Sequence, residues 1–461
     1  MNATFLKSLL GFALAAVALP ALAATSGSQG TLMPPGLRLA VAHSLAHERT
    51  SPRPLGDASS WVEQEVTADD GNADDVFGFS VAIDGDTALI GAAQGAAAGT
   101  GSSNGSAGAV YVFTRKAQGW IESQKLTADD GVDDDQFGYS IALQGSTAVI
   151  GAAFAAVGTN THQGAVYVFT KTGDTWSQAQ KLTADDGATA DQLGWSVALD
   201  GDTAVLGAPG ASINGAFATG AAYVFTQDSG TWSQTAKLTA DDGVGNDDFG
   251  FGVAVNGTTA IITALNANAI QGAAYVFTAT GTDWTQGPKL LADDGAAGDS
   301  LGYAVAFDGT TALIGAPFAA DGGNLFQGAV YAFGAPEGDW VQTQKLVAAE
   351  GLGFDVFGIS ISLSDNDVVI TAPFYNASQG EAFLFSNPTG TEWTEQHTFQ
   401  ASDAVAGAGA AFGYAAAVSH GNVVVGSVFN FVGNNEKQGA AYFYASDRIF
   451  ADGFDAGSEA P

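Results

Sequence analysis

The stretch of sequence that decides the fold is one copy of a repeat. It reads Lys125-Leu126-Thr127-Ala128-Asp129-Asp130-Gly131, Phe137-Gly138-Tyr139-Ser140-Ile141-Ala142-Leu143, Thr147-Ala148-Val149-Ile150-Gly151-Ala152 and Gly164-Ala165-Val166-Tyr167-Val168-Phe169-Thr170, and it closes at Trp176. Four strand-like runs are separated by turn residues, which is the content of one propeller blade. In the equivalent run 77–83, large side chains alternate with Gly, Ser and Ala. A sheet stacked between two neighbours buries both faces, whereas a half-solvated strand would alternate apolar with polar residues.

The repeat occurs seven times, and the first five copies are the most similar to one another. Its closing tryptophans recur at intervals of 52 to 59 residues, at Trp61, Trp120, Trp176, Trp232, Trp284, Trp340 and Trp393. The Phe-Gly or Leu-Gly pairs begin at Phe77, Phe137, Leu193, Phe249, Leu301, Phe357 and Phe412. Self-similarity at such a period is the signature of repeat architectures.

The order of the strands at the two ends predicts a closed ring. The first Trp-led strand, Trp61 to Val66, precedes the first Phe-Gly pair, and the last copy ends near Tyr444 with no Trp-led strand after it. Pairing the N-terminal strand with the last three strands completes the seventh blade and leaves no open sheet edge. We therefore predict an all-β fold, a seven-bladed β-propeller of four-stranded antiparallel blades that is closed by the N-terminal strand.

The segments outside the repeats indicate export. Lys7 precedes the apolar run Leu9–Leu19, and small residues around Ala23 fit signal-peptidase cleavage. We interpret residues 1–23 as a signal peptide, 24–60 as a linker or pro-segment, 61–447 as the propeller and 448–461 as a C-terminal tail. The expected location is secreted, extracellular or at the cell surface. No later run of 18 apolar residues predicts a membrane span.

The composition excludes several classes of partner. The formal net charge is −34, from 48 acidic and 14 basic residues, and there are no cysteines. A polyanion of this size repels nucleic acids and anionic membrane surfaces. Basic proteins, cations and neutral glycans remain as partners, and we expect a monomer. The absence of cysteine excludes disulfides, thiolate metal sites and thiol nucleophiles.

The Phe-Gly and Gly-Ala-Pro elements resemble the FG-GAP repeat of integrin-α-type β-propellers, in the short-loop form of bacterial secreted proteins. The matching residues include Leu193-Gly194 with Gly207-Ala208-Pro209, and Leu301-Gly302 with Gly315-Ala316-Pro317. The resemblance implies a propeller used for adhesion or ligand binding, often with calcium, and no enzymatic activity. The integrin-like calcium loop has no counterpart, because the connection here is a tight turn such as Asp84-Gly85-Asp86.

The acidic residues concentrate instead in the Ala-Asp-Asp-Gly loop before each Phe-Gly pair, which we call the acidic loop. These loops hold 22 of the 48 acids and share a rim with the loops between strands two and three, which vary in length and sequence and which we call the variable loops. One hypothesis is calcium binding, since clustered carboxylates suit a hard cation. The alternative is that Asp-Asp-Gly shapes a turn by capping backbone amides. The candidate ligands are Asp69, Asp70, Asp75, Asp129, Asp130, Asp135, Asp185, Asp186, Asp191, Asp241, Asp242, Asp248, Asp293, Asp294 and Asp299.

Other recurring residues are assigned structural roles. The closing tryptophans and Trp195 are interpreted as packing residues. The lysines at positions such as Lys125 and Lys181 are interpreted as ion-pair partners or as snorkelling stems. No catalytic residue is predicted. The sequence favours a non-catalytic binding or adhesion propeller that recognises a protein or glycan through its acidic loop face. The alternatives are a polysaccharide hydrolase or lyase and a calcium-stabilised surface component.

Overall fold

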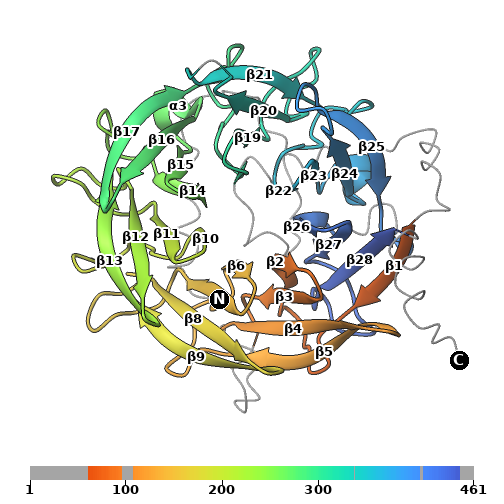
Figure 1. The fold of residues 1–461 in the computed structure, drawn as a ribbon. Coiled ribbons are helices and arrows are strands. Elements are labelled where there is room, and N and C mark those ends of the chain that lie inside the picture. Colours follow the sequence, from red (N-terminus) through yellow and green to blue (C-terminus); the bar gives the residue numbers. More distant parts are fainter. Residues whose placement is uncertain (1–60, 96–106, 337, 405–408, 447–461) are drawn as a thin grey trace, which may run out of the picture.

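The propeller was analysed as a computed structural model, which describes residues 61–95, 107–336, 338–404 and 409–446. The described residues form 28 strands in seven four-stranded antiparallel sheets arranged around a central axis (Figure 1). The predicted all-β, seven-bladed architecture is confirmed. The expected signal peptide, linker and C-terminal tail lie outside the described residues.

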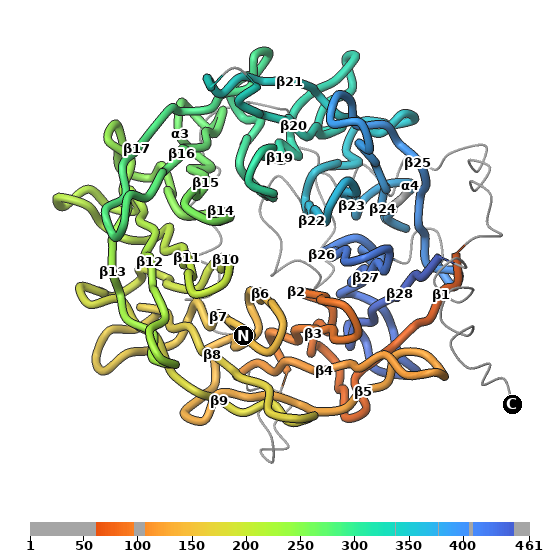
Figure 2. The backbone as a smooth tube through the Cα atoms, viewed as in Figure 1, coloured from red at the N-terminus to blue at the C-terminus, as the bar shows by residue number. Residues whose placement is uncertain are grey.

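Each blade runs from an inner strand at the axis to an outer strand at the circumference (Figure 2). Blade 1 contains β2 (Phe77–Asp84), β3 (Thr87–Ala92), β4 (Ala109–Lys116) and β5 (Gly119–Leu126). Blade 2 contains β6 (Ser140–Gln144), β7 (Thr147–Ala152), β8 (Ala165–Thr172) and β9 (Thr175–Leu182). Blade 3 contains β10 (Val197–Asp200), β11 (Thr203–Ala208), β12 (Ala221–Asp228) and β13 (Thr231–Leu238). Blade 4 contains β14 (Phe249–Asn256), β15 (Thr259–Ala264), β16 (Ala273–Thr280) and β17 (Asp283–Leu290).

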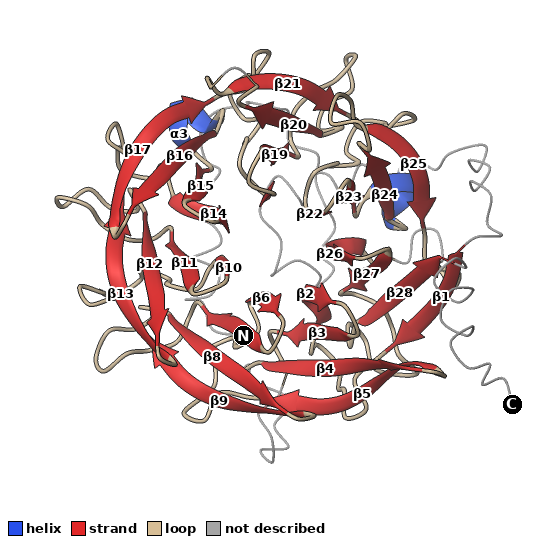
Figure 3. Ribbon diagram, viewed as in Figure 1, coloured by secondary structure: helices blue, strands red, loops and turns tan. Residues whose placement is uncertain are grey.

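The last three blades repeat this order. Blade 5 contains β18 (Val305–Phe307), β19 (Thr311–Ala316), β20 (Ala329–Gly334) and β21 (Val341–Leu346). Blade 6 contains β22 (Ile361–Ser364), β23 (Asp367–Ala372), β24 (Glu381–Ser386) and β25 (Thr394–Phe399). Blade 7 contains β26 (Phe412–Ser419), β27 (Asn422–Ser427), β28 (Ala440–Ser446) and β1 (Trp61–Val66). Two short helical turns, α3 (Ala267–Ile270) and α4 (Tyr375–Ser378), lie in the variable loops of blades 4 and 6 (Figure 3).

The N-terminal strand closes the ring, as predicted. Strand β1 pairs antiparallel with β28 along its whole length, from Trp61 opposite Ser446 to Val66 opposite Ala441. The outer strand of blade 7 therefore comes from the opposite end of the folded chain from its three inner strands. Covering the free edge of β28 removes a template for edge-to-edge aggregation.

Two glycines meet at most of the interfaces between blades. A Cβ built on Gly151, of the Gly-Ala element in blade 2, would lie 2.1 Å from the carbonyl oxygen of Gly194, of the Leu-Gly element in blade 3. The Ser140 hydroxyl donates to the same carbonyl at 2.8 Å. The equivalent contact joins Gly207 to Gly250. The two elements that characterise the repeat therefore pack backbone to backbone across most neighbouring blades, while Thr263 and Thr371 take the place of this glycine in blades 4 and 6.

The hydrophobic core lies between blades. One cluster, for example, joins Val149 and Val168 of blade 2 to Leu206 and Tyr223 of blade 3. The predicted packing role of the tryptophans holds at Trp120, Trp176, Trp232 and Trp393, which are buried. This arrangement explains the alternation of large and small residues, because each sheet presents both faces to a neighbouring sheet.

Glutamine side chains clasp adjacent outer strands. The Gln180 amide in blade 2 donates to the Trp232 carbonyl at 2.7 Å, and the Trp232 N–H donates to Gln180 Oε1 at 2.9 Å. We expect the Q180A variant to lose ~1–2 kcal/mol of unfolding free energy, because two net hydrogen bonds disappear. Urea unfolding followed by tryptophan fluorescence measures this loss.

Blade 3 supplies the reciprocal control for this prediction. Ala236 occupies the position of Gln180 and faces the next tryptophan strand, where no such clasp can form. The A236Q variant is expected to stabilise the ring by a similar amount. An unchanged urea midpoint in both variants would show that the clasp contributes nothing.

Candidate functional site: the loop face

The acidic loops and the variable loops meet on one face of the ring, which we call the loop face. The Ala190 N–H of the acidic loop leading into blade 3 donates to the Thr161 carbonyl of the blade 2 variable loop at 2.9 Å. The same bond joins Asn246 to Phe217 and Phe354 to Leu325, each at 2.9 Å. The prediction that the two loop sets share a rim is confirmed.

The second aspartate in each of the first five acidic loops is held by a tyrosine and a lysine. In blade 2, Asp130 accepts hydrogen bonds from the Tyr167 hydroxyl at 2.8 Å and from Lys181 Nζ at 2.6 Å. Burial raises the pKa of Asp130, but these two donors outweigh it, and the net pKa is lowered. The predicted ion-pair role of the repeated lysines is confirmed at Asp70–Lys125, Asp130–Lys181, Asp186–Lys237, Asp242–Lys289 and Asp294–Lys345.

The third acidic residue caps the turn of its own loop. Asp135 is buried, and its Oδ2 accepts the Val132 N–H at 2.9 Å. Burial raises the pKa of Asp135. The same cap occurs at Asp75, whose pKa burial raises to about 6, and at Asp191, Asp247, Asp299 and Asp355.

In the fourth repeat the structure corrects the predicted residue. Asp247 forms the cap, accepting the Val244 N–H at 2.8 Å, while Asp248 turns inward and is 2% exposed. Asp248 accepts a hydrogen bond from the Asn266 amide, and its Oδ1 has no partner among the described residues. The sequence pattern missed this difference because Asp247 and Asp248 are adjacent. Only Asp247 lies three residues after the N–H that is capped, as Asp135 does in the second repeat.

The first aspartate in each of the first five loops is exposed and, unlike the second, pairs with no lysine among the described residues. The Asp129 backbone N–H donates to Gln178 Oε1 at 3.0 Å, which fixes the loop, while the Asp129 carboxylate faces solvent. The equivalent exposed residues are Asp69, Asp185, Asp241 and Asp293. The three aspartates of one loop thus have three different environments.

These contacts do not fit a calcium ion in the acidic loops. Calcium takes about six to eight oxygen ligands. The second aspartate is occupied by Lys and Tyr, and the third by a backbone N–H. The residues that the structure describes include no group of three or more His, Cys, Asp or Glu side chains placed to hold a metal. Calcium binding stays a prediction from the sequence.

Calcium removal tests the turn-capping alternative. We expect the melting temperature to be the same in excess calcium and in EDTA, because the second and third aspartates of a loop such as Asp130 and Asp135 already have protein partners. Differential scanning fluorimetry at constant ionic strength measures it, with magnesium as the control for general screening of the acidic surface. A rise specific to calcium would restore the calcium hypothesis, since a ligand that binds only the native state must stabilise it.

One position of the variable loops carries apolar side chains in three consecutive blades. The carbonyl that accepts the acidic-loop N–H belongs to Phe217 in blade 3, Ile270 in blade 4 and Leu325 in blade 5. Phe217 and Leu325 are 61% and 60% exposed, and Ile270 is half-buried. We call these three residues the apolar arc. In blades 2 and 7 the same position holds the polar residues Thr161 and Glu436.

Aromatic rings of the inner strands and their leading turns form a chain around the axis. Trp195 contacts Tyr139 and Phe251, with ring centroids 4.8 and 5.5 Å apart, and the chain continues to Phe79 and Tyr303. Trp195 is half-buried within this chain, which agrees with its predicted packing role. Burial raises the pKa of Tyr139 well above its ordinary value.

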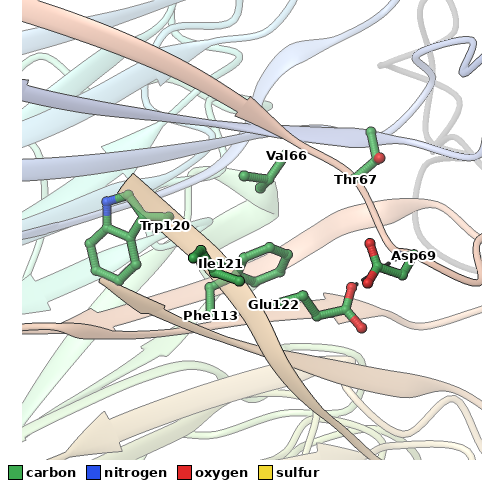
Figure 4. A pocket seen from close by; sticks show the side chains of 7 residues that line it. All are labelled: Val66, Thr67, Asp69, Phe113, Trp120, Ile121 and Glu122. Atoms are coloured by element: carbon green, nitrogen blue, oxygen red, sulfur yellow. Dashed lines mark hydrogen bonds between the residues drawn. The ribbon is translucent and has the colours of Figure 1, made fainter. Parts of the chain in front are cut away.

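A shallow pocket of about 300 Å³ lies at the circumference, where the ring closes (Figure 4). It is lined by Val66, Thr67, Asp69, Phe113, Trp120, Ile121 and Glu122. Glu122 accepts the Asp69 backbone N–H at 3.0 Å, and Trp120 stacks on Phe443 with centroids 4.3 Å apart. The Glu122 carboxylate, which β5 contributes to the pocket, therefore already binds the backbone of the acidic loop.

The fold is a closed seven-bladed β-propeller, and the same Asp-Tyr-Lys contact recurs in its first five repeats. A family model for the FG-GAP repeat matches more than half of the chain, at residues 61–113, 120–169, 176–225, 232–277, 284–333 and 340–385. The chain belongs to the FG-GAP repeat family. Among curated proteins the comparison found no match.

The matched units are offset from the blades. The unit 176–225, for example, begins at Trp176 in the outer strand of blade 2 and ends at Phe225 in the third strand of blade 3. Each unit therefore links two blades. The three inner strands of blade 7 lie beyond the six matched units, yet they form the same sheet as the others. Within the described residues, no helix has the length and apolar character needed to cross a membrane.

Proposed function

We propose that this propeller is an exported, non-catalytic binding or adhesion module that recognises a protein or glycan through its loop face. The apolar arc, set among exposed carboxylates, is the observation that carries this proposal. Side chains such as Phe217 and Leu325 gain stability when a partner covers them, because burial removes apolar surface from water. Loops held by a rigid scaffold are the usual location of binding residues.

Further support comes from the strands. Strand β1 covers the edge of β28, so blade 7 has the same four strands as the other blades. The repeated Asp, Tyr and Lys residues bind one another. The loop tips carry further side chains that are available to a partner, among them Phe217 and Leu325. The predicted signal peptide, residues 1–23, supports the exported location.

The proposal predicts saturable binding of a ligand without its chemical conversion. Purified full-length protein is applied to a glycan array and to a displayed peptide library, and saturable hits are measured by biolayer interferometry. The F217S/L325S variant should lose these hits. The matched control is V62S/V341S, whose two residues are 48% and 47% exposed on outer strands away from the loop face. No saturable binding in either screen, or equal loss in both variants, would overturn the proposal.

A further inference from the structure

We infer that the partner is a cationic polypeptide with apolar side chains, bound across the loop tips of blades 3 to 6. This inference rests on the proposed function and specifies the chemistry of the partner. It depends on two features of the same surface, which are exposed apolar contacts at two blade junctions and an excess of carboxylates that have no cation.

The apolar contacts lie at the junctions of blades 3 and 4 and of blades 5 and 6. At the first, Phe217 and Val244 are 61% and 62% exposed, and the Phe217 carbonyl accepts the N–H of Asn246, two residues from Val244. At the second, Leu325 is 60% and Leu352 is 41% exposed, and the Leu325 carbonyl accepts the Phe354 N–H. Ile270 of the apolar arc lies on the blade between these junctions.

The symmetry of the repeat shows that these residues are not required for folding. At the equivalent junction of blades 2 and 3, the same backbone hydrogen bond is made by Thr161, and the residue in the place of Val244 is Ala188. At the junction of blades 7 and 1 these places hold Glu436 and Asn72. The loop keeps its geometry with polar or small residues, so the large apolar side chains serve something other than the loop conformation.

The charges beside these junctions favour a cation. The lysines of the region are neutralised, since Lys237, Lys289 and Lys345 each bind the second aspartate of an acidic loop at 2.6 to 2.8 Å. The exposed carboxylates of Asp241, Asp293 and Glu350 have no ion-pair partner among the described residues. Complementary charge raises association rates and selects partners, and here the uncompensated charge is negative.

The combination favours a polypeptide over a glycan. Aliphatic tips such as Val244, Leu325 and Leu352 provide dispersion contacts without hydrogen bonds, and they match side chains such as Leu or Phe of a partner. A neutral glycan, by contrast, would be recognised by precisely placed polar groups on a concave surface. Nucleic acids and anionic membranes would be repelled by the same carboxylates.

Three labelled peptides of equal length test the inference by fluorescence anisotropy with the full-length protein. The Lys/Leu peptide combines both required features, the Lys/Ser peptide has only the charge, and the Glu/Leu peptide has only the apolar side chains. We expect the Lys/Leu peptide to bind at least ~10-fold more tightly than the Lys/Ser peptide, a difference equivalent to ~1.4 kcal/mol, and the Glu/Leu peptide not to bind. Raised salt should weaken the binding, since it screens exposed charges.

Three variants locate the interaction. F217S/L325S keeps every charge and should weaken Lys/Leu binding at least ~10-fold, whereas V62S/V341S should bind as the wild type does. D241N/D293N should reduce the salt dependence. Equal binding of the Lys/Leu and Lys/Ser peptides, or unchanged affinity in F217S/L325S, would overturn the inference. The proposed function would survive if the loop face instead captured a neutral glycan, and it would fail together with the inference if nothing bound saturably or if F217S/L325S and V62S/V341S lost binding equally.

Discussion

The G220A variant is expected to fail to fold or to lose most of its stability. Gly220 immediately precedes β12, the third strand of blade 3, with φ +88°, and a Cβ there would lie 2.0 Å from the Phe249 carbonyl oxygen of blade 4. The two residues form a parallel bridge between blades. The clash is with backbone on a neighbouring sheet, so relief requires the blades to move apart. We expect a loss of more than ~3 kcal/mol, from the strained conformation and the disrupted interface.

The control for this variant is G230A in the same blade. Gly230 has nearly the same conformation, with φ +86°, but nothing lies within 4 Å of its added Cβ. It should lose only ~1–2 kcal/mol, the cost of a left-handed alanine. Urea unfolding monitored by fluorescence measures both variants, with circular dichroism for material that does not fold. Equal losses would show that backbone conformation, and not blade contact, makes glycine necessary at position 220.

Replacing Asp248 with Asn is expected to stabilise the protein, and the gain should grow as the pH rises from 5 to 9. Burial is the main cause that raises the pKa of Asp248, to about 8, while the hydrogen bond from Asn266 lowers it and the Asp247 charge raises it. In the unfolded chain the group ionises near its ordinary value of 3.8. Since the folded pKa is the higher one, the unfolding free energy of the wild type decreases as the pH rises from the unfolded to the folded pKa. The decrease is complete above about pH 8.

The size of this effect is on the order of 5 kcal/mol at its upper bound, because each tenfold difference in proton affinity is worth about 1.4 kcal/mol. The measurement is the difference in urea-unfolding free energy between D248N and wild type at each pH, which cancels the contribution of the other acids. D241N, at an exposed carboxylate of the same loop, is the control and should show no growing gain. A D248N difference that stays constant with pH would contradict a neutral buried Asp248.

The repeat made most of the architecture predictable. The alternation in runs such as 77–83, and the placement of Trp61 before the first Phe-Gly pair, were sufficient for blade content, blade number and closure, because a propeller blade leaves few other ways to bury both faces of a sheet. The lysine register also predicted its ion pairs, since Lys181 recurs at a fixed distance from the acidic loop. Six family units alone would have left the three inner strands of blade 7 without a match.

The candidate site was less predictable because it depends on contacts between blades. The sequence grouped three acids of each loop as equivalent ligands, but Asp129 faces solvent, Asp130 meets Tyr167 and Lys181, and Asp135 caps its turn. The partners of Asp130 lie 37 and 51 residues away, on the third and fourth strands of the blade. Only the folded sheet brings them together.

The apolar arc also required the tertiary structure. Phe217 and Val244 lie in different loops of different copies. The backbone hydrogen bond from Asn246 to Phe217 across the blade junction brings the two loops together. The sequence by itself determined a closed ring of seven acidic blades, because local strand patterns and their order are sufficient to specify which sheets form. The tertiary structure decided which carboxylates are neutralised and which apolar side chains are exposed, because both depend on contacts between residues far apart in the chain.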